Sequence, residues 1–139
     1  MPTTLTPLHD EHQKLYPHIE ALREAADAVA ADLSAEVVAH LDAAVEFLVH
    51  HLLPHASAEE AALYPAVGRA MGSPLATATM SRDHVEVAAI TRELQGLVAR
   101  VGAGERGAAL ATDLRRVLYG LHALVRVHFA KEEEVYVPL

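Results

Sequence analysis

Residues 55–60 (HASAEE) and residues 128–133 (HFAKEE) carry the same pattern, and the rest of the chain is organised around them. In each stretch a histidine is followed four residues later by a glutamate, and a proline stands ten residues after the histidine, at Pro65 and Pro138. Four residues of an α-helix turn through about 400° and rise about 6 Å, so the imidazole and the carboxylate point the same way. Such a pair can hold a metal ion. Two pairs predict two ions or one shared dinuclear centre.

The composition indicates one domain spanning residues 1–139. Apolar residues make up 52% of the chain and aromatic residues only 4%, so the core must be aliphatic, which favours helices. The net charge of −8 argues against nucleic acid and anionic membrane as partners. We expect a cytoplasmic protein, because no apolar run approaches the roughly 20 residues of a membrane span, no signal peptide is visible and cysteine is absent.

Hydrophobic periodicity predicts four helices, over about residues 7–31, 35–63, 80–98 and 110–136. No stretch alternates apolar and polar residues as a half-buried strand does. Four helices with short joints predict an all-α fold, an up-down-up-down antiparallel four-helix bundle.

Turn and cap residues mark the expected helix ends. Thr6 and Ser34 are predicted N-caps of the first two helices. The stretch Gly68–Met80 is a predicted connection, in which Ser73 caps the third helix, and Gly102–Gly107 is a glycine-rich break before the fourth.

Two prolines fall inside predicted helices. Pro17 should kink the first helix, because proline removes one amide and crowds the carbonyl four residues earlier. Pro54 stands one residue before His55. It produces either an ordinary kink or a bend that aims His55 inward.

The two halves of the chain repeat each other. An acidic residue directly precedes a histidine at His12 and again at His84. From His12 to His55 is 43 residues, and from His84 to His128 is 44. Two helical hairpins related by a pseudo-twofold axis would therefore bring four histidines and two glutamates together inside the bundle: His12, His55, Glu59, His84, His128 and Glu132.

Each of these residues alone has an ordinary explanation. A single histidine at a helix interface is usually hydrogen-bonded in the core, and a His–Glu pair four residues apart usually lies on the surface. These glutamates, however, share stripes with leucines and valines, and burying six polar groups there is costly unless something binds them. A pair of metal ions binds all six. Mixed imidazole and carboxylate ligands favour iron, manganese, zinc or copper over calcium and magnesium.

The order of histidine and glutamate along the helices distinguishes this chain from one class of di-iron protein. Ferritin-like di-iron bundles carry Glu-x-x-His on two helices, whereas this chain carries His-x-x-x-Glu. The chain instead resembles the hemerythrin-like family, the HHE cation-binding domains, from about Leu8 to Pro138. The motifs that carry the resemblance are Glu11-His12, His55-x-x-x-Glu59-Glu60 followed by Leu63-Tyr64-Pro65, Asp83-His84, and His128-x-x-x-Glu132-Glu133.

The resemblance implies a cofactor of two iron ions with an oxo or hydroxo bridge, with manganese and zinc as alternatives. In such a site histidines hold the irons terminally and two glutamates bridge them. By position, the implied metal ligands are His12, His55, Glu59, His84, His128 and Glu132.

One position departs from the oxygen carriers of the family. They place a second histidine one turn after the ligand of the third helix, where this chain has Ala88. The two irons then have one histidine ligand fewer than in the oxygen carriers, unless His51, one turn before His55, is that ligand. Tyr16 and Tyr64 are candidate functional residues, since a phenol near the site can donate a hydrogen bond to bound peroxide or ligate Fe(III). Ordinary packing is the alternative for both.

A carboxylate is also expected to hold some ligand imidazole from outside. Glu60, Glu133 and Glu134 are predicted to be solvated or to fill this role. Glu11 and Asp83 face about 100° away from their neighbouring ligands and are predicted to be surface charges, although they are candidates too. Surface or packing roles are expected for the histidines that fit no metal spacing: His9, His18, His40, His50 and His122.

An under-ligated di-iron centre leaves positions open to a small diatomic or peroxide ligand. This favours catalase-like or peroxidase-like turnover, or NO detoxification, with an unknown electron donor. The alternative is a non-enzymatic O2 or NO carrier, or an iron or redox sensor. A third interpretation is a helical interaction module with vestigial ligands. Substrate and oligomeric state do not follow from the sequence.

Overall fold

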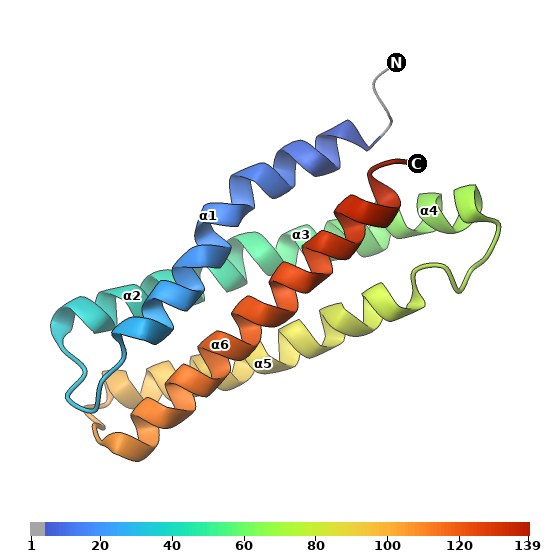
Figure 1. The fold of residues 1–139 in the computed structure, drawn as a ribbon. Helices are drawn as coiled ribbons and strands as arrows, with labels where there is room; N and C mark the ends of the chain where they lie inside the picture. Colours follow the sequence, from blue (N-terminus) through green and yellow to red (C-terminus); the bar gives the residue numbers. More distant parts are fainter. Residues whose placement is uncertain (1–4) are drawn as a thin grey trace.

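Over residues 5–139, which the computed structural model describes, the chain is helical and contains no strand. Four helical rods run antiparallel in sequence order, which confirms the expected up-down-up-down bundle (Figure 1). The second rod comprises several consecutive elements that together run without a break. The elements are α1 (Thr6–Ala28), α2 (Ala35–Phe47), η1 (Leu48–Leu52), α3 (Leu53–Ala58), η2 (Glu59–Leu63), α4 (Tyr64–Met71), α5 (Ala78–Gly102), α6 (Ala108–Lys131) and η3 (Glu132–Tyr136).

The helix ends follow the cap residues, with four corrections. Ser34 caps α2 as predicted, since its Oγ accepts a hydrogen bond from the backbone N–H of Val37. The first helix ends at Ala28 rather than near residue 31. The second rod continues past Gly68 to Met71, where Gly72 takes the left-handed conformation (φ 69°) that ends helices.

The third correction concerns the start of α5. Ser73 does not cap this helix, because its Oγ accepts from the backbone N–H of Leu75 within the connecting turn. Helix α5 begins at Ala78 instead. Thr6 is the first residue of α1 rather than its N-cap, which is Leu5. The predicted glycine-rich break is confirmed between α5 and α6.

Three segments wind as π-helix, and each ends two residues before a proline. The amides of Leu53, Tyr64 and Val137 each bond to the carbonyl five residues earlier rather than four. Proline lacks an amide and crowds the carbonyl one turn back, which favours such a widened turn. Pro54 therefore accompanies a widened turn in front of His55. Pro17, by contrast, lies inside a continuous α1.

The core comprises two clusters along the bundle axis. A large aliphatic cluster fills most of the bundle, and a small one around Tyr64, Val67, Met80 and Tyr136 lies near the end where α4 meets α5. On α5, Met80 belongs to the small cluster and Val87 to the large one, so the residues between them lie between the two clusters.

The stretch Ala35–Met71 is apolar and long enough to cross a membrane by length and composition alone, contrary to the expectation from the sequence. Core helices of soluble proteins and signal sequences pass the same test, and 33% of the most apolar window is buried here. Here Leu41, Leu48 and Leu52 point into the large cluster, so the apolar side of the stretch is used for packing.

Candidate metal centre

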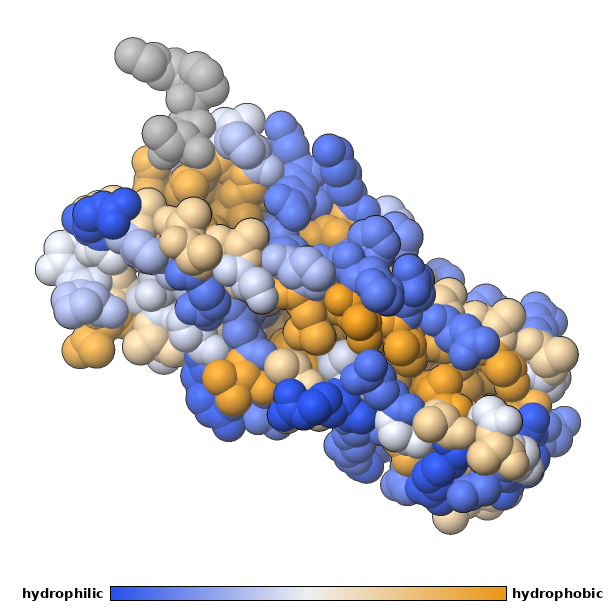
Figure 2. Space-filling model, turned by 180° about the vertical axis from the view of Figure 1, so that it is seen from behind, coloured by the Kyte–Doolittle hydropathy of each residue, from blue (hydrophilic) through white to orange (hydrophobic). Residues whose placement is uncertain are grey.

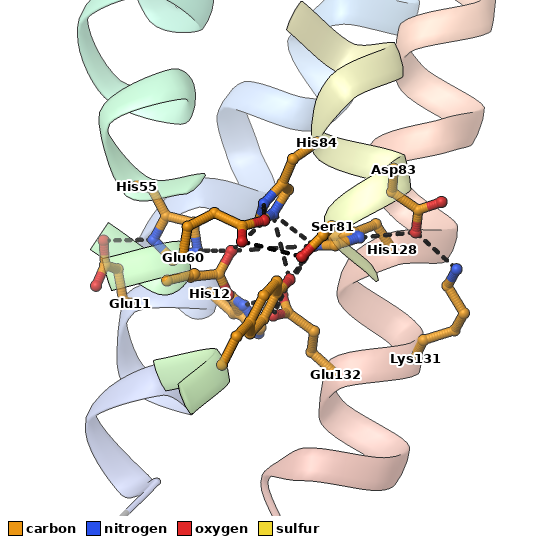
Figure 3. Close-up of polar contacts among 12 residues, drawn as sticks. Glu11, His12, His55, Glu60, Ser81, Asp83, His84, His128, Lys131 and Glu132 are labelled. Atoms are coloured by element: carbon orange, nitrogen blue, oxygen red, sulfur yellow. Dashed lines mark hydrogen bonds and ion pairs between the residues drawn. The ribbon is translucent and has the colours of Figure 1, made fainter. Parts of the chain in front are cut away.

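Six side chains from all four rods meet between the two apolar clusters (Figure 3). His12 and Glu132 are fully buried, three others are almost so, and the sixth, His84, is partly buried. Helix α1 supplies one histidine, the second rod a histidine and a glutamate, α5 one histidine, and α6 with η3 the last histidine and glutamate. The structure thus brings together all six residues singled out in the sequence: His12, His55, Glu59, His84, His128 and Glu132.

Each glutamate faces histidines of both halves of the chain. The Oε1 atom of Glu59 lies 3.4 Å from Nε2 of His55, 3.1 Å from Nε2 of His84 and 3.9 Å from Nε2 of His128. The Oε1 atom of Glu132 lies 3.3 Å from Nε2 of His12 and 3.4 Å from Nε2 of His128. Both carboxylates are therefore placed to be shared between two cations.

The donor atoms form two overlapping groups. In one, ligand atoms of His12, His55, Glu59 and Glu132 all lie within 4.8 Å of one another. In the other, those of Glu59, His84 and His128 do so. Glu59 belongs to both groups. This arrangement fits two neighbouring cations joined by a carboxylate.

Unpaired atoms in the centre support the same conclusion. The buried atoms His12 Nε2, His55 Nε2, Glu59 Oε2 and Glu132 Oε1 have no hydrogen-bond partner. On the other side, Nε2 of His84 lies 3.1 Å from Nε2 of His128. Buried polar atoms without partners cost roughly 1–3 kcal/mol each, and imidazole nitrogen and carboxylate oxygen are the donors that iron, manganese and zinc accept. The residues present therefore fit a pair of metal ions.

Four carboxylates hold the four histidines from outside, among them Glu11, Glu60 and Asp83, which are labelled in Figure 3. The Nδ1–H of each imidazole donates to a carboxylate of another rod, which leaves Nε2 directed at the centre. The pairs are His12 with Glu133 (2.7 Å), His55 with Glu11 (2.6 Å), His84 with Glu60 (2.7 Å) and His128 with Asp83 (2.9 Å).

These pairs follow the pseudo-twofold repeat. The acidic residue before each early histidine holds the late histidine of the same half, so Glu11 binds His55 and Asp83 binds His128. From their facing direction, Glu11 and Asp83 are predicted to be surface charges, with a contact to a ligand imidazole as the alternative. The structure has the alternative, since each carboxylate accepts a hydrogen bond from a histidine of the next rod. Glu134, also a candidate, is exposed.

Sequence reasoning missed a further layer of contacts. The residue three positions before each early histidine binds the same carboxylate as that histidine: His9 lies 2.8 Å from Glu133, and Ser81 lies 2.9 Å from Glu60. The positions match across the repeat, and this correspondence was the available signal. Lys131 lies 2.6 Å from Asp83 and has no counterpart in the first half, where the matching residue is alanine.

The charges of the centre reinforce one another in the metal-free chain. Burial opposes charge on Glu59, but the interactions with His128, His55 and His84 around it outweigh burial and hold the pKa of this carboxyl far below its usual range. Burial likewise opposes protonation of His55 and His128. Hydrogen bonds and charges of the surrounding carboxylates prevail, raising the pKa of His55 to about 9 and that of His128 to about 10.

Tyr64 lies in the centre, whereas Tyr16 lies beside it. The Tyr64 hydroxyl is 3.2 Å from Nε2 of both His84 and His128, and it donates to Oε2 of Glu132 at 3.1 Å. Burial, together with the nearby carboxylates, raises the pKa of Tyr64 far above its usual range. The ring of Tyr16 is 6.4 Å from that of His12.

His51, considered as a seventh ligand, lies outside the centre. It is exposed and stacks on His18, with ring centroids 6.4 Å apart. The widened turn Leu48–Leu52 explains the difference, because it inserts an extra residue between His51 and the face that carries His55. The Tyr64 hydroxyl lies 3.2 Å from Nε2 of His84, the histidine supplied by the helix on which this chain has Ala88 where a second histidine was considered.

A small cavity of about 10 Å³ adjoins the centre. Ligand residues His55, Glu59, His84 and His128 form part of its wall. The remainder is apolar, contributed by Leu52, Ala56, Val87, Val125 and Phe129. Such a volume is close to the minimum that holds a single water-sized group next to the donor atoms.

Comparison with known proteins agrees with this geometry. Neither the curated proteins nor the solved structures contain a match to this chain. The model of one family, described as the hemerythrin HHE cation-binding domain, matches residues 3–139. With this match over nearly the whole chain and a buried His/Glu cluster that can hold metal, the protein belongs to the hemerythrin HHE cation-binding domain family.

Proposed function

We propose that the chain is a non-haem di-iron protein that reacts with O2, peroxide or NO, in catalase-like or peroxidase-like turnover or in NO detoxification. The observation that carries this proposal is the set of unpaired, converging nitrogen and oxygen donors beside a small apolar cavity. Iron bound there supplies redox equivalents and an open coordination position for a small ligand.

The residues of the chain hold the donor atoms in place and limit access of water. The outer carboxylates fix the tautomer and direction of each imidazole. The ring of Phe129 stacks on that of His12, with centroids 4.2 Å apart, and lines the cavity. The phenol of Tyr64 stays protonated and can donate a hydrogen bond or a proton to a ligand between His84 and His128.

A second candidate function is an O2 or NO carrier, or a sensor of iron or redox state. One observation favours the sensor. The donors come from all four rods, so bound metal would link the whole bundle and stabilise the folded state by mass action. Loss of the ions would then loosen the fold.

Metal analysis, spectroscopy and turnover together test these proposals. We expect two iron ions per chain and the charge-transfer absorption of an oxo-bridged diferric pair. Added peroxide should be converted to oxygen, or added NO consumed, over many turnovers. Reversible O2 spectra without net consumption would instead favour the carrier. A purified protein that retains no metal after reconstitution would refute both proposals.

Replacing Tyr64 by phenylalanine should alter the iron-loaded protein without unfolding it. The substitution removes only the hydroxyl that contacts His84, His128 and Glu132. We expect a changed visible spectrum and a fall in peroxide turnover of about 10²-fold, the usual contribution of one proton donor. Tyr136→Phe is the matched control, since this buried hydroxyl donates to the backbone carbonyl of Ala76 instead. If the spectra and turnover rates of both variants equal those of the unsubstituted protein, Tyr64 has no role in the reaction.

A further inference from the structure

Lys131 departs from the twofold repeat around the centre. Its Nζ lies 2.6 Å from Oδ2 of Asp83, and the same oxygen accepts a hydrogen bond from Nδ1–H of His128 at 2.9 Å (Figure 3). Asp83 is only 17% exposed, so water screens these charges less than it screens a pair on the open surface. An ammonium group therefore lies directly behind one of the donor histidines.

The matching place in the first half carries no cation. Lys131 stands three residues after His128, and Ala58 stands three residues after His55. Glu11, which holds His55, is 54% exposed, and the alanine offers it no counter-charge. The two outer carboxylates thus differ, because one faces water and the other is neutralised by a lysine.

A neutralised carboxylate makes its imidazole a weaker metal donor. A carboxylate that accepts Nδ1–H raises the basicity of the opposite nitrogen, Nε2, which is the nitrogen directed at the centre. An ammonium group bonded to the same carboxylate oxygen opposes this effect, and its own charge repels a cation at Nε2. Lys131 therefore weakens the cation position at His128 relative to the one at His55.

The two donor groups differ in the same direction. The first position has four donor residues, all of them buried: His12, His55, Glu59 and Glu132. The second position has three, of which one histidine is only partly buried: Glu59, His84 and His128. A cation at the second position thus has fewer donors as well as a positive charge behind one of them.

We propose that Lys131 makes the two metal positions unequal, so that the first position fills first and the second position fills last and loses its ion first. Lys131 is a positioning residue, since it acts through Asp83 and His128 and does not itself bind metal. The inference rests on the part of the proposed function that puts two cations in the centre, and it does not depend on the redox reaction.

Stepwise titration of the metal-free chain with Co²⁺, followed by visible absorption and calorimetry, measures both affinities. Lys131→Met removes the charge and keeps the length of the side chain. We expect the Kd of the second step to fall about tenfold, the lower end of the effect of a group that tunes a ligating histidine, with the first step unchanged. Lys131→Arg keeps the charge and should leave both Kd values unchanged. An unchanged or higher Kd of the second step in Lys131→Met would overturn the proposal.

The mirrored substitution identifies which position fills first. Two ions at equal positions also bind in two steps, because they repel each other, so the step must be assigned to a position. Ala58→Lys places an ammonium group near Glu11, as Lys131 lies near Asp83, and position 58 is exposed. We expect the Kd of the first step to rise about threefold, less than tenfold because Glu11 is more exposed than Asp83. A first step that Ala58→Lys leaves unchanged would contradict the assignment.

A control separates this effect from the loss of any surface charge. Hydrophilic side chains cover much of the face of the molecule shown in Figure 2. Arg126→Met removes a positive charge from an exposed position on the same helix and should leave both Kd values unchanged. A shift as large as that of Lys131→Met would overturn the specific role of the lysine. A chain that binds no Co²⁺ would refute this inference and the proposed function together, whereas two ions bound with the same affinities in every variant would overturn this inference alone.

Discussion

Glu59→Gln is expected to weaken metal binding at both positions, by at least about a hundredfold. Residues that merely orient a ligand contribute 10–100-fold to affinity, and Glu59 is itself a donor in both groups of the centre. The substitution keeps the size of the side chain and removes its charge. It leaves the imidazoles of His55, His84 and His128 without the carboxylate they share. Anaerobic titration with Fe²⁺ and metal analysis of the dialysed protein measure the loss.

An exposed pair provides the control for this substitution. Glu46 and His50 also lie four residues apart on the second rod, with Oε2 of Glu46 3.5 Å from Nε2 of His50 and both side chains largely exposed. Glu46→Gln should leave stoichiometry and affinity unchanged. Retention of two tightly bound ions in Glu59→Gln would contradict the shared-carboxylate geometry. Binding of one ion at full affinity would show that the two positions are independent.

The metal-free protein should lose stability as the pH rises from 6.5 to 10. His55 and His128 have pKa values of about 9 and about 10 in the folded chain, above the ordinary value of 6.5. A group whose pKa is raised by folding contributes fully below its unfolded pKa, and that contribution is lost as the pH rises through its folded pKa. The two imidazoles share carboxylates, so we expect a combined loss of a few kcal/mol rather than the sum of both.

Urea unfolding in the presence of a chelator measures this loss at pH 6.5, 8 and 10. The urea midpoint should fall steadily, and His50→Gln, which removes an exposed imidazole, should preserve the slope. A midpoint independent of pH would show that the buried imidazoles are neutral in the metal-free fold.

Metal binding should reverse this pH dependence. A cation binds the neutral imidazole, so loading near pH 7.5 should release one proton each from His55 and His128. Affinity should therefore rise with pH up to about 10. Proton release in weakly buffered solution provides the measurement, and loading without any release would contradict the raised pKa values.

The sequence by itself determined the helical class, the repeat and the six residues that meet in the centre. These features are local or periodic. A spacing of four places a histidine and a glutamate on one helix face, and a repeat of 43 and 44 residues brings matching faces together in an antiparallel bundle. Short-range rules therefore suffice to identify His12, His55, Glu59, His84, His128 and Glu132 as a set.

Only the tertiary structure decided which groups meet across rods. Residues facing 100° from a ligand on their own helix, such as Glu11 and Asp83, still reach a histidine of the next rod, because the contact depends on how each rod is rotated. The widened turns change that rotation. A π turn contains an extra residue, so Tyr64, five positions after Glu59, faces the centre as Glu59 does, while His51 is turned away.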